Sequence, residues 1–67
     1  MVDSKIIGAR LLKLRGERPR EEVALAVGIS VSALTMYETG KRIPRDEIKI
    51  KLAKYFSSSV GAIFFEQ

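Results

Sequence analysis

A glycine at position 28 separates two short segments in which apolar residues recur at helical spacing, and this pattern constrains the chain more than any other feature. A residue without Cβ adopts a left-handed backbone at little cost, so Gly28 can end one helix, and Ser30 can cap the next through its hydroxyl. Helices that cross at about 90–120° approach closely beside their turn, which favours a small residue at Ala24. Residues 20–39 are therefore predicted to form two short helices joined by a tight turn. The apolar positions of this pair are Val23, Ala24, Val27, Ile29, Leu34 and Tyr37.

Helical patterns on both sides of this pair fill the rest of the chain. Asp3 or Ser4 can cap a first helix, Asp46 opens a fourth, and a short terminal helix is expected at about residues 60–65. No alternation typical of strands occurs. The predicted fold class is therefore all-α, with five short helices in a single domain over residues 1–67 and the pair described above as helices 2 and 3. The expected inward-facing residues of the flanking helices are Ile7, Leu11, Leu14, Ile48, Leu52, Ala53, Phe56, Val60, Ile63 and Phe64.

Length and composition exclude several classes of protein. A chain of 67 residues has no room for a cleft between two domains. It contains no Cys and no His, so disulfides and thiolate or imidazole metal sites are absent. No cofactor, metal, small-molecule ligand or enzymatic activity is expected. No apolar run approaches the roughly 18 residues of a membrane span, and Lys5, Arg10, Lys13 and Arg15 interrupt any signal-peptide pattern, so a cytoplasmic protein is expected.

The charge of the chain favours a polyanionic partner. Twelve Lys and Arg residues stand against eight Asp and Glu residues, which gives a formal net charge of +4. The positive side chains gather at residues 10–20 and 41–54, whereas none occurs from Glu21 to Gly40. Without a geometry that brings both stretches to one ligand, they can equally be solvated surfaces. Five of these residues are interpreted as solvated charges only: Lys13, Arg18, Lys49, Lys51 and Lys54.

The sequence resembles the Cro and cI-like (XRE) helix-turn-helix domains of phage repressors and bacterial regulators. The stretches that carry the resemblance are IGARLLKLR, EEVALAVGISVSALTMYETGKRIP and LAKYFSSSVGAIFF, which together span almost the whole chain. The resemblance implies a lambda-repressor-like domain of five helices. It also implies that the chain binds a palindromic operator in double-stranded DNA as a symmetric homodimer, with the second helix of the pair in the major groove. The chain is accordingly expected to be a sequence-specific transcriptional regulator that acts as a repressor.

Roles for individual residues follow from the same resemblance. Contacts with base edges are implied for Val31, Ser32, Thr35 and Met36. Contacts with phosphates are implied for Arg20, Thr39, Lys41, Arg42 and Arg45. The dimer contact falls on the terminal helix, at Gly61, Ala62 and Phe65. Arg15 and Glu38 match an internal salt bridge of the family and are interpreted as structural, as are Ala24 and Gly28.

Three departures from the family pattern affect these roles. The connection from Arg15 to Arg20 is about two residues shorter than usual, and Pro19 replaces the usual Ser or Thr cap. The recognition helix also lacks Arg, Lys, Asn and Gln, the side chains that contact bases bidentately. Its readout is therefore expected to be apolar, through single hydrogen bonds, or indirect through DNA shape. The alternative is an antitoxin-like or adaptor module on the same fold, in which Val31 and Met36 face a protein.

The two adjacent aromatic residues near the C-terminus bear on assembly. Neighbouring residues on a helix point about 100° apart, so Phe64 and Phe65 cannot both join one core. Phe65 is expected to be exposed, and the small Gly61 and Ala62 beside it would let two copies approach closely. The alternative is a frayed end that carries a stray aromatic side chain.

Overall fold

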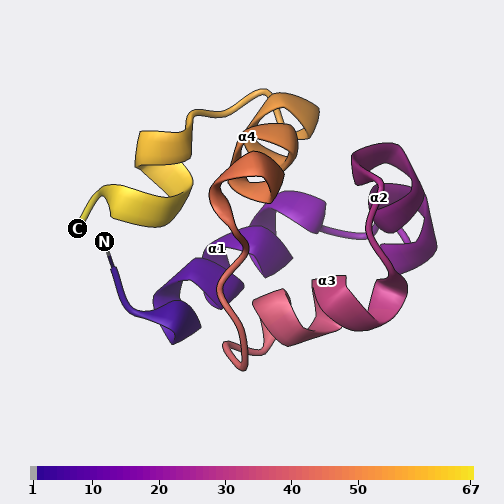
Figure 1. The fold of residues 1–67 in the computed structure, drawn as a ribbon, viewed down its shortest axis with the longest axis horizontal. Helices are drawn as coiled ribbons and strands as arrows, with labels where there is room; N and C mark the ends of the chain where they lie inside the picture. The colour runs from indigo at the N-terminus through magenta and orange to yellow at the C-terminus, as the bar shows by residue number, and fades with distance from the viewer. Residues whose placement is uncertain (1) are drawn as a thin grey trace.

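The computed structural model describes residues 2–67. This part of the chain folds into five helices and contains no strand (Figure 1). α1 crosses the middle of this view, with α3 below it and α4 above it. The segment between α3 and α4 runs across the front of the molecule. The expected all-α fold with five helices is confirmed. The elements are α1 (Ser4–Arg15), α2 (Arg20–Val27), α3 (Val31–Glu38), α4 (Asp46–Tyr55) and the π-helical η1 (Gly61–Phe65).

Local capping residues set the ends of the central helices. The carboxylate of Asp3 accepts a hydrogen bond from the backbone N–H of Lys5 (2.7 Å), so Asp3 rather than Ser4 caps α1. The hydroxyl of Ser30 accepts from the backbone N–H of Ala33 (3.0 Å) at the start of α3. Gly28 has φ +82° and ψ +36°, the left-handed conformation predicted for the end of α2. The turn between α2 and α3 is thus fixed at both sides by residues that the sequence identifies.

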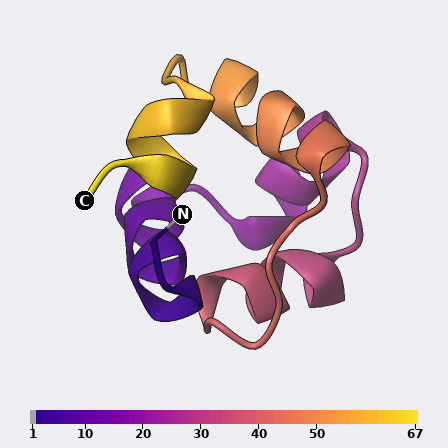
Figure 2. The ribbon, with the colours of Figure 1, turned by 60° about the vertical axis from the view of Figure 1, so that its left-hand side comes forward.

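The core draws on every helix. All three buried residues of α2 are among the predicted ones, and Phe64 is fully buried whereas Phe65 is 47% exposed, as expected. Val2, which the sequence pattern did not single out, is also buried. Its backbone N–H donates to the carbonyl of Phe64 (3.2 Å), which joins the start of the chain to η1. The start of α1 and the segment before it lie beside η1 in both views (Figures 1 and 2).

The expectation that Lys49 is a solvated charge is wrong. Lys49 is only 7% exposed, and its Nζ lies 3.3 Å from a carboxylate oxygen of Asp46. The same Nζ lies 5.9 Å from the ring centroid of Phe64 and 5.3 Å from that of Phe65. A lysine can bury its aliphatic stem beside aromatic rings while its ammonium group stays near their faces and a carboxylate. This packing places η1 against α4.

α1 and α3 come into backbone contact at a second glycine. A Cβ added at Gly8 would lie 2.5 Å from the carbonyl oxygen of Glu38 and 2.8 Å from that of Tyr37. Real Cβ atoms do not approach a carbonyl oxygen so closely, and the obstacle is backbone that cannot rotate away. The distance between α1 and α3 therefore depends on the missing side chain of Gly8.

We expect Gly8→Ala to lower the free energy of unfolding by about 1–3 kcal/mol, because the new methyl group forces α1 away from α3. Urea unfolding followed by circular dichroism measures this change. Gly61→Ala is the matched control: the nearest atoms to its added Cβ lie at 3.7 Å, so its effect should stay within about 1 kcal/mol. Equal stability of the two variants would contradict the close approach.

Candidate nucleic-acid interface

The outward face of α3 is small and uncharged. Val31, Ser32, Thr35 and Met36 share one side of this helix, and each is exposed or partly exposed. The hydroxyl of Thr35 donates to the carbonyl of Val31 (2.9 Å), so its proton is engaged and its oxygen remains an acceptor. Contacts with base edges from this face would be made by methyl groups and single hydroxyls. It offers none of the bidentate donor pairs that discriminate between bases most strongly.

A basic loop follows α3 and stays close to it. The backbone N–H groups of Lys41 and Arg42 both donate to the carbonyl of Met36, at 2.9 and 3.3 Å. Their side chains are exposed and form no ion pair with any described residue. Pro44 is fully buried and anchors the far end of the loop. Two cations are thus held beside the end of α3 by backbone hydrogen bonds and a buried proline.

Two further residues expected to contact phosphates, Thr39 and Arg45, have partners within the chain. The hydroxyl of Thr39 donates to the carbonyl of Thr35 (2.8 Å), where it closes the last turn of α3. Arg45 precedes α4, and its guanidinium lies 3.8 Å from the carboxylate of Glu47 in an exposed pair. Such a pair adds little to stability, so the guanidinium can leave it at little cost.

A fully buried carboxylate joins the first three helices. Nε of Arg15 donates to Oε2 of Glu38 (2.7 Å), and Nη2 of Arg15 donates to Oε1 (3.2 Å). Nε of Arg20 donates to Oε1 of the same carboxylate (2.8 Å). The family resemblance implied the pair of Arg15 and Glu38, but it did not imply that Arg20 shares it. The sequence carries no local signal for this second partner, because Arg20 and Glu38 are 18 residues apart and meet only where the helices pack.

Arg20 lies between the core and the surface. It is the first residue of α2, and its side chain is 35% exposed, whereas that of Glu38 is fully buried. Nε is committed to Glu38, while the two Nη groups form no hydrogen bond with the described part of the chain. The guanidinium is therefore held at the start of α2 with donors still available to an anion.

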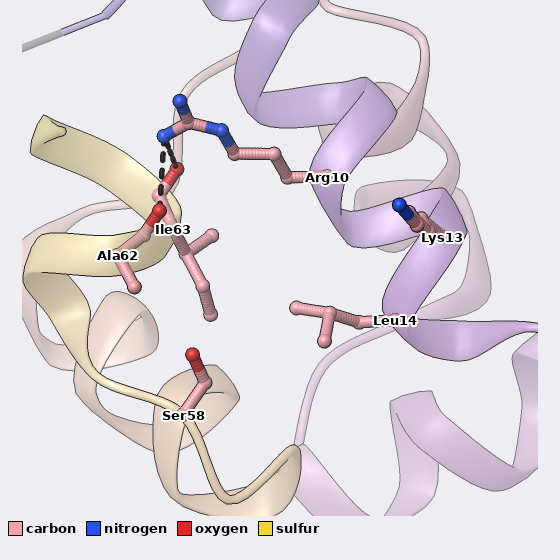
Figure 3. Close-up of a pocket in the computed structure, with 6 residues that line it drawn as sticks. All are labelled: Arg10, Lys13, Leu14, Ser58, Ala62 and Ile63. Carbon is pink, nitrogen blue, oxygen red and sulfur yellow. Dashed lines mark hydrogen bonds between the residues drawn. The ribbon is translucent and has the colours of Figure 1, made fainter. Parts of the chain in front are cut away.

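The residues of the predicted dimer contact lie away from α3. Figures 1 and 2 show η1 and α3 on different sides of α1. Arg10 fixes η1: its Nη1 donates to the carbonyls of Ala62 (2.9 Å) and Ile63 (3.1 Å), as Figure 3 shows. Its Nη2 donates to the carbonyl of Glu66 (2.6 Å). From the sequence alone, Arg10 is only one member of a basic stretch. Its hydrogen-bond partners lie more than 50 residues away along the chain, so they leave no local signal.

Two concave surfaces flank η1. A cleft of about 490 Å³ lies between α1 and η1, lined by apolar Leu14 and Ile63 with Lys13 at its side (Figure 3). A groove of about 280 Å³ lies between α4 and η1. Its apolar lining consists of Ile50, Val60 and Phe65. Phe65 is thus exposed beside other apolar side chains rather than alone.

Residues 2–67 contain no group of three or more His, Cys, Asp or Glu side chains that could hold a metal ion. No helix in this part of the chain is long and apolar enough to span a membrane.

A family model described as helix-turn-helix matches residues 10–63, which include α2, α3 and the basic loop. No curated protein matches the sequence significantly.

We expect Glu38→Gln to lower the free energy of unfolding by about 3–5 kcal/mol, because Arg15 and Arg20 would lose their charged partner inside the protein. Chemical denaturation measures this loss. Glu47→Gln removes an exposed carboxylate and should change stability by no more than about 0.5 kcal/mol. A Glu38→Gln variant as stable as the Glu47→Gln variant would show that the buried carboxylate does not hold the three helices together.

Proposed function

Because this chain belongs to the XRE-type helix-turn-helix family of DNA-binding regulators, we propose that it binds a palindromic operator as a homodimer and represses transcription. The observation that carries the proposal is the exposed, uncharged face of α3 with Lys41 and Arg42 held directly beside it. α3 would enter the major groove while the loop follows the phosphate backbone. Because the proposed dimer has twofold symmetry, the operator that it binds would be a palindrome.

Discrimination between sequences would come from a small set of contacts. Val31 and Met36 can pack on thymine methyl groups, and Ser32 and Thr35 can each make one hydrogen bond with a base edge. Sequence-dependent DNA shape would add to this readout at positions that the protein does not touch. We therefore expect modest specificity from α3 itself.

Most of the affinity would come from cations outside α3. Lys41, Arg42 and Arg45 are exposed, and Arg20 keeps its Nη donors at the start of α2. Four such contacts per protomer would give a dimer about eight phosphate contacts. Thr39 contributes less, because its hydroxyl must leave the carbonyl of Thr35 before it can donate to a phosphate.

The homodimer would form through η1. Gly61 and Ala62 are small and only partly covered, and Phe65 is 47% exposed next to Ile50, which is 49% exposed. A twofold interface brings the same patch of each copy together, so Phe65 and Ile50 of one copy would meet the same patch of the other. Val60 extends this apolar patch.

Selection of bound duplexes from a random DNA pool tests the proposed function. We expect a palindrome whose half-sites lie about one helical turn apart, because a twofold dimer presents two α3 helices to successive major grooves. An absence of any enriched sequence would contradict the proposal and favour a protein partner for the face of α3.

The selected duplex then allows the phosphate contacts to be counted. Affinity should fall steeply with salt, and Arg42→Gln should reduce the slope of log K against log[salt] by about 1.8, because each dimer loses two contacts. Lys13→Gln removes an equally exposed charge from α1 and should leave the slope unchanged. Equal slopes for all three proteins would exclude Arg42 as a phosphate contact.

We expect Phe65→Asp to raise the dimer dissociation constant at least about tenfold, because it places a charge at the centre of the apolar patch. Sedimentation equilibrium measures this constant. Leu25→Asp is the matched control, since Leu25 is 84% exposed on α2 and outside the patch. An intact dimer of the Phe65→Asp variant would rule out this interface.

A further inference from the structure

We propose that the groove between α2 and α4 binds an acidic segment of a partner protein that also carries apolar side chains. The groove has a volume of about 550 Å³. It contains none of the residues assigned above to DNA or to the dimer, so the inference does not rest on the proposed function. Its lining includes Leu25, Ala26 and Gly28 from the end of α2, and Lys51, Lys54 and Tyr55 from the end of α4.

The apolar part of the groove centres on Leu25. This side chain is 84% exposed, more than any other large apolar side chain of the described residues. Val23, Ala24 and Val27 occupy the buried face of α2, so Leu25 cannot turn into the core without breaking the helix. A single exposed leucine is common on protein surfaces. Here it borders a concave surface that Ala26 and the ring of Tyr55 continue, which gives an apolar side chain of a partner a place to pack.

The charge of the groove is positive. Lys51 and Lys54 lie one turn apart on α4 and both line the groove. Lys54 forms no ion pair with the described residues, and the carboxylate nearest to Lys51 is that of Glu47 at 4.0 Å, in a pair of which both members are more than half exposed. Both ammonium groups are therefore available to carboxylates of a partner.

Two charged side chains, Glu22 and Arg18, contact Tyr55 at its end of the groove. Glu22 accepts a hydrogen bond from the hydroxyl of Tyr55 (3.2 Å). The guanidinium of Arg18 lies 5.4 Å from the centroid of the same ring, which adds a cation to this end. Glu22 forms no ion pair with Lys51 or Lys54. Together with Arg18 these lysines outnumber Glu22, so the positive charge of the groove favours an acidic occupant.

The position and the chemistry of the groove favour a protein over DNA. In both views α3 lies at the bottom of the molecule and α4 at the top, so a duplex on the outward face of α3 would not lie along α4 (Figures 1 and 2). A phosphate backbone also gains nothing from an exposed leucine, whereas an amphipathic peptide covers the leucine with its apolar side chains and meets the lysines with its carboxylates. Gly28 brings the groove next to the turn before α3 without covering the face of that helix.

The test uses two synthetic amphipathic peptides of about 15 residues, long enough to be helical when bound. Both have Leu on one face; one has Glu on the other face, and the second has Lys in place of every Glu. Each is titrated into the ¹⁵N-labelled full chain. We expect the acidic peptide to shift the amide signals of residues 25–28 and 51–55, and the basic peptide to leave them in place. Saturating amounts of the selected DNA duplex should not displace the acidic peptide.

Matched variants separate the groove from the basic face of α3. Lys51→Glu with Lys54→Glu should weaken binding of the acidic peptide at least about tenfold, and Leu25→Ser should also weaken it. Lys41→Glu with Arg42→Glu changes the net charge equally and should leave peptide binding within about twofold. The proposal is overturned if the acidic peptide does not bind, if the basic peptide binds equally well, or if only the Lys41/Arg42 variant loses binding. It also fails if the Lys51/Lys54 variant loses DNA affinity as Arg42→Gln does, because the groove would then be a DNA contact.

Discussion

The buried carboxylate of Glu38 is the interaction on which the rest of the structure depends. It comes from the last residue of α3 and receives hydrogen bonds from Arg15 of α1 and Arg20 of α2. Removing a charge from water is costly, and here the charged donors of two arginines offset that cost. The backbone carbonyl of the same residue lies directly against Gly8, where α1 and α3 approach each other closely. One residue therefore sets both the orientation of the helix pair and its distance from α1.

This arrangement has consequences for the surface beside α3. Because Nε of Arg20 donates to Glu38, the side chain of Arg20 is anchored at the core, while its Nη groups remain available to an anion. In the loop, hydrogen bonds to the carbonyl of Met36 hold the backbone of Lys41 and Arg42, whereas their side chains are exposed and form no ion pair with the described residues. A side chain that is already ordered loses less conformational entropy when it binds. A change at Arg20 would therefore affect both the stability of the fold and the proposed phosphate contact, whereas changes to the side chains of Lys41 and Arg42 would affect the proposed contacts alone.

η1 lies on another side of the molecule and is held mainly by contacts with other elements, because so short a helix has little stability of its own. η1 has five residues, and it is fixed by Arg10 through carbonyls, by Val2 through a backbone hydrogen bond, and by Lys49 through aromatic rings. With Phe64 buried, this packing leaves Phe65 exposed next to Ile50. The lining of the groove between α2 and α4 includes none of the residues assigned to the other two surfaces. The domain thus presents three chemically distinct faces on 67 residues.

The sequence by itself determined the features that arise from neighbouring residues. The left-handed turn at Gly28, the cap at Ser30, the buried faces of α2 and α4, and the exposure of Phe65 all follow from periodicity and backbone preference within a few residues. Only the tertiary structure decided that Gly8 touches the backbone of α3, that Arg20 shares the carboxylate of Glu38, that Arg10 holds η1, and that Lys49 is buried. Each of these contacts joins residues whose approach depends on how the helices pack. Helical spacing shows which face of a helix is apolar, but it does not show which charged or small residue of another helix lies opposite, because that is set by crossing angle and distance.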